Sequence, residues 1–192
     1  MGLRERNRRA AMHATQRTAL RLFRERGFAA ITVEEIAAEA GMAASTVFRH
    51  FGTKEAVVIW DEHDAALDNA LARRLARQPP FEAMRDAFVE TLAQRYEADL
   101  AFELDRVQFI YQTEALHAAA VEAQFADRDE LTAALADLLS PADGHTAPLM
   151  AGAALLALDV AIDQWQQRDG KEPLGDLIHG AFETLQRLNT VR

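Results

Sequence analysis

Residues 44–54 hold the side chains of this chain that are best suited to bind a phosphate backbone or a base edge. They carry hydroxyl, guanidinium, imidazole and ammonium donors and no Asp or Glu. A guanidinium can donate to both acceptors of a guanine edge, and hydroxyl and ammonium groups bind phosphate oxygens. A carboxylate among them would repel phosphate. The donors are Ser45, Thr46, Arg49, His50 and Lys54, and their types indicate a surface that faces DNA.

The residues around this stretch predict two short helices joined by a tight turn. Thr32 followed by Glu35 is the capping-box pattern that opens a helix. Gly41 then supplies a turn residue that is free to adopt a positive φ. In the second helix, Val47 and Phe51 lie four apart on the side that should face inward. Two such helices form a helix-turn-helix, whose second helix enters the major groove of DNA.

The outward side of the second helix predicts how each contact is made. Arg49 is its only long donor, so a bidentate bond to guanine is its expected role, beside Ala44 and Ser45 at base edges. Thr46, His50 and Lys54 are expected at phosphates, together with the amino-terminal arginines. The full set predicted to contact DNA is Thr32, Val33, Ala44, Ser45, Thr46, Phe48, Arg49, His50 and Lys54. The competing interpretation is a solvated helical hairpin in an ordinary helical protein.

The charge of the chain is divided unevenly along its length. Residues 1–58 hold ten Lys and Arg and six Asp and Glu, a net +4, whereas residues 59–192 hold eleven and twenty-four, a net −13. Such asymmetry indicates that the amino-terminal part meets nucleic acid. The densest basic cluster is Arg4, Arg6, Arg8 and Arg9. It forms either a solubilising tail or a basic arm that reaches phosphates or the minor groove.

The composition limits the remaining classes of protein. The 192 residues are 49% hydrophobic, enough for a sizeable core and one or two domains. Without cysteine the chain has neither a disulfide nor a thiolate metal site, which suits a reducing cytoplasm. No run of eighteen apolar residues occurs, and residues 1–26 are too charged for a secretory signal. We therefore expect a soluble cytoplasmic protein that does not enter a membrane.

Helical periodicity recurs along the whole chain, and the alternation typical of strands is missing. A first helix is expected over about 8–26, and a long one from Thr53 to Arg77, ahead of two prolines. Further helices are expected at about 81–97, 99–116, 118–139, 148–168 and 173–190, with a loop over 140–148. The predicted fold class is all-α.

Residues 32–58 resemble the DNA-binding domain of the tetracycline-repressor (TetR) family of one-component bacterial regulators. The matching residues are Thr32, Ile36, Ala37, Gly41, Thr46, Phe51, Lys54 and Glu55, preceded by Leu22, Phe23, Gly27 and Phe28. Phe48 stands where Tyr is usual, so it is expected to pack or to touch a thymine methyl rather than bind phosphate. Ala43 stands where Ser is common, which removes a side-chain N-cap. Thr15 and Gln16 stand where the first helix usually carries aliphatic residues.

The resemblance implies that two parts of the chain have different functions. It implies a helix-turn-helix DNA-binding domain over residues 1–53 and a helical effector-binding and dimerisation domain over residues 54–192. The expected partners are a double-stranded DNA operator with pseudo-palindromic sequence and a small-molecule effector that releases a homodimeric repressor. Residues 53–64 are also similar to a subgroup common in actinobacteria, for which a hydrophobic or acyl-type effector is expected.

Two apolar stripes near the carboxyl end are candidates for the dimer interface. They recur at helical spacing and consist of Leu155, Leu158 and Ile162 on one helix and Leu177, Phe182 and Leu185 on the next. Such stripes could simply be core. The resemblance implies instead that these two helices pair with their copies as a four-helix bundle, and two-fold symmetry suits a palindromic operator.

The middle helices offer residues suited to an effector pocket, which the resemblance implies. The candidates are Trp60, His63, Phe88, Phe102, Arg106, Phe109, Ile110 and Trp165. Mostly apolar walls with a few polar groups are typical of ligand sites, although each aromatic residue taken singly could equally be core. Arg106 lies within an apolar face, where it could pair with a carboxylate on an adjacent helix or bind an acidic ligand.

An enzyme is the alternative class. Glu114 and His117 form an E-x-x-H pattern, and Asp176 and His179 form a similar one, as in di-iron carboxylate bundles. The second pattern has Asp and lies on the predicted dimer helix, and phosphate loops, nucleophile elbows and zinc spacings are missing. We therefore expect no catalytic residue, metal or cofactor. A DNA-binding repressor without an effector remains a further alternative.

Overall fold

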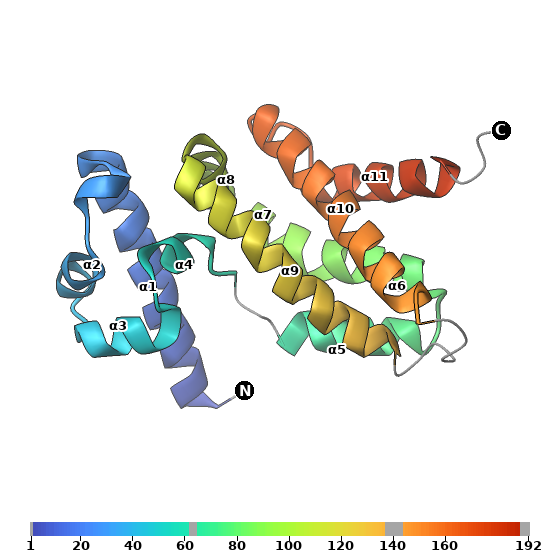
Figure 1. Ribbon diagram of the computed structural model, residues 1–192, viewed down its shortest axis with the longest axis horizontal. Coiled ribbons are helices and arrows are strands. Elements are labelled where there is room, and N and C mark those ends of the chain that lie inside the picture. The colour runs from blue at the N-terminus through green and yellow to red at the C-terminus, as the bar shows by residue number, and fades with distance from the viewer. Residues whose placement is uncertain (1, 62–64, 137–143, 189–192) are drawn as a thin grey trace. The chain divides into compact units, whose positions relative to one another are not determined.

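Every regular element in the described part of the chain is helical, which confirms the all-α fold class. The computed structural model describes residues 2–61, 65–136 and 144–188 (Figure 1). The chain divides into two compact units, the first comprising Met1–Glu62 with Phe109–Ala120, and the second comprising His63–Gln108 with Val121–Arg192.

The first unit is built around one long helix at its amino-terminal end. It contains α1 (Leu3–Arg26), the 3-10 turn η1 (Phe28–Ala30), α2 (Val33–Glu39), α3 (Ala44–Phe51) and α4 (Lys54–Ile59). The helix α1 contacts α2 and α4, and α3 contacts α2 and α4. Its core holds Ala19, Leu20, Phe23, Ile31, Ile36, Ala37, Val47, Val57 and Val58, all at most 3% exposed.

Local sequence signals explain where these helices begin and end. Gly27 ends α1 with φ 86°, and Gly41 turns the chain between α2 and α3 with φ 67°. Both angles lie in the left-handed region that favours glycine. The predicted capping box is present, because the Thr32 hydroxyl accepts from the Glu35 N–H and the Glu35 carboxylate accepts from the Thr32 N–H.

The predicted long helix from Thr53 to Arg77 is wrong. The helix α4 ends at Ile59, and Trp60 leaves the helical conformation with φ −52° and ψ 112°. The next helix, α5, begins at Ala65. Contacts of Trp60 inside the first unit hold it out of the helix, since its ring packs on His13 and Phe51 and its carbonyl accepts from Gln16.

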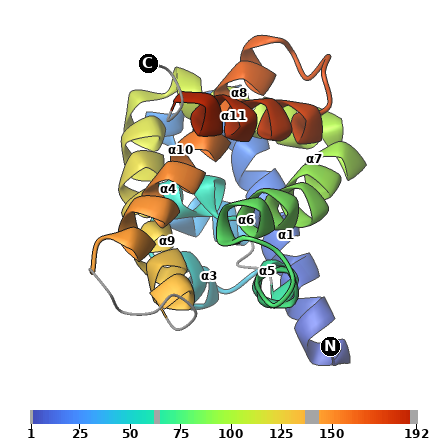
Figure 2. The same cartoon turned by 90° about the vertical axis from the view of Figure 1, so that its right-hand side faces the viewer.

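The second unit is a set of antiparallel and crossing helices. In chain order it contains α5 (Ala65–Leu75), α6 (Pro80–Phe88), the π-helical turn η2 (Val89–Ala93), α7 (Gln94–Ala98), most of α8 (Leu100–Gln112), most of α9 (Glu114–Ala136), α10 (Thr146–Gln167) and α11 (Leu174–Leu188). The helices α10 and α11 pack against each other and against α6 (Figure 2). The break between α8 and α9 falls at Thr113, a few residues before the predicted one.

Alanine forms the buried face of α10. Ala151, Ala154, Ala157 and Ala161 are at most 4% exposed, and Trp165 continues the same face. Small side chains let neighbouring helices approach closely, so the larger leucines of α10 lie on its flanks and its outer side. The outer side is apolar, because Leu149 is 70% exposed and Leu156 is 57% exposed.

The same helix is long and apolar enough to cross a bilayer by length and composition. Over an eighteen-residue window its mean hydropathy is 1.5, and 28% of that window is buried. A single helix of this kind is weak support for a membrane span, because a core helix passes the same test.

Ion pairs join α5 to α6 and to the turn η2 that follows α6. Arg74 donates to Asp86 at 3.2 Å and to Glu90 at 2.8 Å, and Arg73 donates to Glu90 at 2.6 Å. The hydrogen bond from Arg74 lowers the pKa of the Glu90 carboxyl. These pairs are partly exposed, so they contribute modestly to stability.

Candidate nucleic-acid interface

The helix α3 separates its side chains as a recognition helix should. Val47 is fully buried and Phe51 is 9% exposed, so both face the core as predicted. On the opposite side Ser45 and Arg49 are exposed and Phe48 is 42% exposed. The other predicted contacts of this helix, Ala44, Thr46 and His50, are half-buried at its rim.

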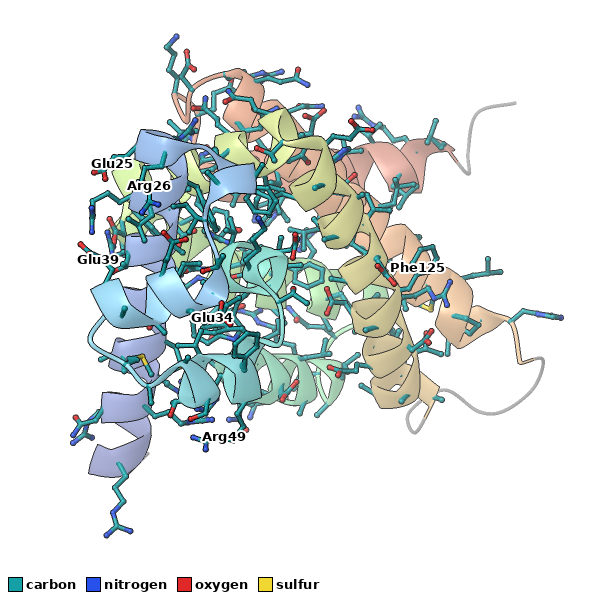
Figure 3. All side chains as sticks on the ribbon, turned by 60° about the vertical axis from the view of Figure 1, so that its left-hand side comes forward. Glu25, Arg26, Glu34, Glu39, Arg49 and Phe125 are labelled. Carbon is teal, nitrogen blue, oxygen red and sulfur yellow. The ribbon has the colours of Figure 1, made fainter. Side chains whose placement is uncertain are left out.

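Arg49 has its donors available for a ligand. Its side chain extends outward from α3 (Figure 3), and within the described residues it makes no hydrogen bond or ion pair. Five N–H groups in a planar fork therefore remain open to acceptors on another molecule. No acidic residue occurs on α3, so nothing on the helix itself neutralises this guanidinium.

The amino-terminal end of α3 lacks a side-chain cap. Ala43 occupies the N-cap position with φ −68° and ψ 133°, and no side chain accepts from the first turn. This confirms the loss of the N-cap that Ala43 predicts. Backbone N–H groups of this turn are thus left for solvent or a ligand.

Thr32 and Val33 lie at the start of α2, and their surroundings are structural. Val33 is 8% exposed and belongs to the core. Thr32 is exposed but uses its hydroxyl and its N–H in the capping box with Glu35. That N–H and the guanidinium of Arg26, at 2.6 Å, lower the pKa of the Glu35 carboxyl. A phosphate contact from the Thr32 hydroxyl stays a prediction.

Acidic and basic residues form ion pairs on the outer faces of α1 and α2. Arg21 donates to Glu25 at 3.2 Å and to Glu39 at 2.6 Å. Figure 3 shows Glu25, Arg26 and Glu39 at one end of the unit, and Arg49 at the opposite end. Figure 3 also labels Glu34, which lies between these two ends, so the carboxylates of α2 are not confined to the end opposite Arg49.

Lys54 is placed differently from the phosphate contact that its sequence position predicts. Its Nζ lies 2.8 Å from the Phe28 carbonyl and 3.2 Å from the Ile31 carbonyl. The ammonium also lies 4.4 Å from the centre of the Phe28 ring. Lys54 thus ties α4 to the segment that precedes α2, and two of its three donors are engaged within the unit.

Two polar residues of α1, Thr15 and Gln16, have partners that the sequence did not indicate. Thr15 is fully buried, and its hydroxyl donates to the Ala11 carbonyl and contacts the Met42 sulfur, each at 2.9 Å. Gln16 is 2% exposed and donates to carbonyls at the end of α4. Their departure from an aliphatic pattern is the only signal in the sequence that could have singled them out.

The residues predicted to line an effector pocket are divided between the two units. Trp60, Phe109 and Ile110 belong to the first unit, where Trp60 contacts Phe51, and Phe109 stacks on Phe23. His63 lies outside the described residues. The remaining candidates, Phe88, Phe102, Arg106 and Trp165, belong to the second unit.

Arg106 is buried with a carboxylate partner on its own helix. It is 2% exposed and donates to Glu103 at 2.7 Å and to the Tyr96 hydroxyl at 3.0 Å. Trp165 packs on Tyr96, with the centres of the two rings 5.5 Å apart. The structure pairs Arg106 with a carboxylate, but Glu103 lies three residues earlier on the same helix and not on an adjacent helix as predicted. Binding of an acidic ligand stays a prediction.

The residues predicted at the dimer interface differ in exposure. Leu155, Leu158, Ile162 and Leu185 are half-buried, whereas Leu177 and Phe182 are buried within the unit. Phe182 packs on Phe81 at 4.7 Å and on Phe88 at 6.3 Å. The most exposed apolar side chains of α10 are Leu149, Leu156 and Val160, which the predicted stripe did not include.

The two patterns that suggested a metal enzyme belong to different units. Glu114 and His117 belong to the first unit, and Asp176 and His179 belong to the second. His117 is exposed and packs against Tyr111 at 5.2 Å. Among the residues that the structure describes, no three His, Asp or Glu side chains gather as metal ligands would.

Two known protein families match different parts of the chain. The family of bacterial regulatory proteins named tetR matches residues 17–59, and the family named MftR C-terminal domain matches residues 78–189. The HTH-type transcriptional regulator TcmR of Streptomyces glaucescens is 37% identical over 101 residues, which cover 52% of this chain and 45% of TcmR. The uncharacterised HTH-type regulator YerO of Bacillus subtilis (strain 168) is 44% identical over 43 residues, which cover 22% of this chain and 15% of YerO. The matches span less than half of these relatives.

Solved structures share the fold over nearly the whole chain. FadR of Thermus thermophilus, a TetR-family repressor in complex with lauroyl-CoA, is 24% identical with a TM-score of 0.55, covering 94% of this chain and 96% of FadR. NalD of Pseudomonas aeruginosa, the secondary repressor of a multidrug efflux pump, is 20% identical with a TM-score of 0.58, covering 93% and 96%. A complex of SmeT with triclosan is 20% identical with a TM-score of 0.51, covering 93% and 91%.

An all-helical chain with a helix-turn-helix, an exposed basic second helix and these matches belongs to the DNA-binding transcription regulators. Within that class, the chain belongs to the TetR family of bacterial regulatory proteins.

Proposed function

We propose that this protein is a homodimeric repressor that binds a pseudo-palindromic operator in the cytoplasm and is released by a small hydrophobic effector. Residues 1–53 read DNA, and residues 54–192 bind the effector and form the dimer. The observation that carries the proposal is the outer side of α3, a helix without acidic residues, where Arg49 has no partner in the described part of the chain and lies on the same side as Ser45.

The contacts of this recognition helix follow from their chemistry. Ala44, Ser45 and Arg49 face base edges, and Thr46 and His50 bind phosphates together with the arginines of residues 4–9. Phe48, 42% exposed and without a hydroxyl, packs against a thymine methyl. A two-fold dimer places two copies of α3 in successive major grooves, one helical turn of DNA apart.

An apolar effector is supported by the residues of the second unit. Phe88, Phe102 and Trp165 make this unit rich in aromatic side chains, with Phe88 and Trp165 in its core, and the guanidinium of Arg106 is already paired with Glu103. An acidic group on the effector would compete with that carboxylate. Lauroyl-CoA, bound by one protein of the same fold, carries an apolar acyl chain on a polar coenzyme A group, and triclosan, bound by another, is a largely apolar phenol.

The test is fluorescence anisotropy of the full-length protein with DNA from upstream of its own gene, beside a scrambled duplex, across a salt series. We expect tight binding to the upstream DNA alone and a linear fall of log K with log salt, since Arg and Lys contacts to phosphate release counterions. Weak and equal binding to both duplexes, repeated with duplexes selected from random DNA, would refute a sequence-specific regulator.

The bound upstream duplex then serves as the probe for effectors. Fatty acyl-CoA thioesters of increasing chain length and hydrophobic phenols should lower the anisotropy, whereas free coenzyme A should not. Release by polar ligands only would contradict the apolar effector.

A further inference from the structure

A buried amide on α1 faces the end of α4. The Nε2 atom of Gln16 lies 3.2 Å from the Val57 carbonyl oxygen, 3.1 Å from that of Val58 and 2.7 Å from that of Trp60. Gln16 is 2% exposed, and its bonds to Val57 and Val58 are buried, whereas the bond to Trp60 is partly buried. A side chain separated from its acceptors by more than forty residues is thus committed to one helix end.

Gln16 supplies donors at the carboxyl end of α4, which ends at Ile59, where a helix has no further N–H groups of its own for its last carbonyls. An amide has two N–H groups, which Gln16 shares among three acceptors. An aliphatic residue would fill the same volume but would take this donor from the buried Val57 carbonyl, which is costly.

The bond to Trp60 connects this helix end to the recognition helix. The Trp60 ring lies 5.7 Å from the Phe51 ring in an edge-on arrangement, and 5.1 Å from the His13 ring. Phe51 is the last residue of α3 and lies on its inner side. A contact path therefore runs from the Gln16 amide through Trp60 to the buried face of α3.

We propose that Gln16 is a positioning residue for DNA recognition. Its amide holds the last turn of α4 and Trp60 in one orientation against α1, and Trp60 in turn supports the inner face of α3. Directional hydrogen bonds in a buried site select a single arrangement, whereas apolar packing alone tolerates several. The proposal rests on the DNA-binding function proposed above, because its effect is the accuracy with which α3 meets base edges.

The test uses the full-length protein in three variants. Gln16→Met keeps the volume without donors, and Gln16→Ala leaves room for water at the freed carbonyls. The control Leu116→Ala removes a fully buried side chain of α9 in the same unit, so it lowers stability without touching the Gln16 bonds. Each variant is studied below its own melting transition.

Two readouts separate positioning from stability. The chain has two tryptophans, Trp60 and Trp165, so protein labelled with 5-fluorotryptophan gives two fluorine resonances. DNA binding is measured with a duplex that the wild-type protein selects from random-sequence DNA, beside an unselected duplex, across a salt series. The ratio of the two affinities reports base reading, and the salt slope reports phosphate contacts.

We expect Gln16→Met to shift or broaden the Trp60 resonance and to leave that of Trp165 unchanged. Its affinity for the selected duplex should fall about tenfold, roughly 1.4 kcal/mol of binding free energy, with the salt slope and the unselected duplex unaffected. Leu116→Ala should melt at lower temperature and keep the wild-type affinity ratio. If Gln16→Met does not fold, Gln16→Ala should show the same pattern.

The proposal is overturned if the Trp60 resonance stays in place or if the affinity ratio stays at its wild-type value. Failure of both Gln16 variants to fold would also overturn it, because the role would then be one of stability alone. A wild-type protein that selects no duplex at all would refute the proposed DNA-binding function. If its Trp60 resonance still responds to Gln16→Met, the Gln16 hydrogen bonds nevertheless position Trp60.

Discussion

At the scale of single residues, side chains of similar chemistry are used in different ways in this unit. Arg49 points outward and makes no bond or ion pair among the described residues, whereas the Lys54 ammonium is bonded to two carbonyls. A free guanidinium fork matches the two acceptors of guanine. We expect the Lys54 ammonium to contribute to DNA binding chiefly by holding α4 to the segment before α2.

Replacing Arg49 by Ala should weaken binding to the operator by about 1–3 kcal/mol and relax specificity at one base pair. The reason is that only the correct base pair offers both acceptors to the guanidinium. The measurement is anisotropy on the operator and on three duplexes that carry the other base pairs at that position. Arg49→Lys is the control, since it keeps the charge and loses the fork. Equal weakening on every sequence would identify Arg49 as a phosphate ligand instead.

Replacing Lys54 by Met should lower the free energy of unfolding and leave the salt slope of DNA binding unchanged. The methionine keeps the apolar stem beside Phe28 but leaves two carbonyls without their donor. Chemical denaturation and a salt series of operator binding measure the two effects. A slope shallower by about 0.9 would show that Lys54 contacts a phosphate after all.

At the scale of elements, the helix-turn-helix is held by contacts at helix ends. The capping box opens α2, the Thr53 hydroxyl accepts from Ala56 to open α4, and Gln16 closes α4. The helices α2, α3 and α4 are short, with seven, eight and six residues, so their own hydrogen bonds are too few to stabilise them. End contacts and core packing must therefore supply their stability.

The capping box makes the stability of this unit depend on pH. The folded-state pKa of Glu35 lies below its ordinary value, so the stabilisation by its carboxylate is complete at neutral pH and is lost as pH falls through that lowered pKa. Glu35→Gln keeps the hydrogen-bond geometry and removes the charge. Its deficit in free energy of unfolding should be present at pH 7 and shrink once the pH falls below about 4.3, the usual pKa of Glu. Urea titrations of both proteins between neutral and acidic pH measure this, and a deficit independent of pH would contradict it.

At the scale of the whole molecule, the proposed dimer depends on the outer side of α10. Alanines face the core of the second unit, so this helix leaves Leu149, Leu156 and Val160 exposed. Such a surface suits burial against a second copy, and two-fold symmetry would then present two recognition helices.

Leu156→Glu should convert the dimer to a monomer and abolish tight operator binding while each subunit stays folded. A carboxylate at the two-fold interface would have to be buried without a partner. Light scattering after size exclusion gives the mass, and circular dichroism gives the fold. Phe125→Glu is the matched control, because Phe125 is also 57% exposed but lies on α9, where it stacks with Arg128 (Figure 3). A dimer that survives Leu156→Glu would place the interface elsewhere.

Interactions between neighbours in the chain made part of this protein predictable. The capping box, the turns at Gly27 and Gly41 and the inward Val47 and Phe51 each depend on a few adjacent residues, so the residue types alone determine them. The same holds for the family, because the residues that carry the resemblance lie close together in the chain, between Leu22 and Glu55. The donors predicted to face DNA likewise lie on one short helix and just after it.

Other features depend on residues that meet only after the chain has folded. Tertiary structure decided four of them. They are the end of α4 at Ile59, the acceptors of the Gln16 amide, the acceptors of the Lys54 ammonium and the burial of the alanine face of α10. A helical period of three or four marks an apolar face, but it does not say which of two apolar faces is covered. Similarly, a polar side chain does not reveal whether its acceptor lies on DNA or on a helix forty residues away. The free energy of burial and hydrogen bonding decides both, and it is defined only once those distant segments are in contact.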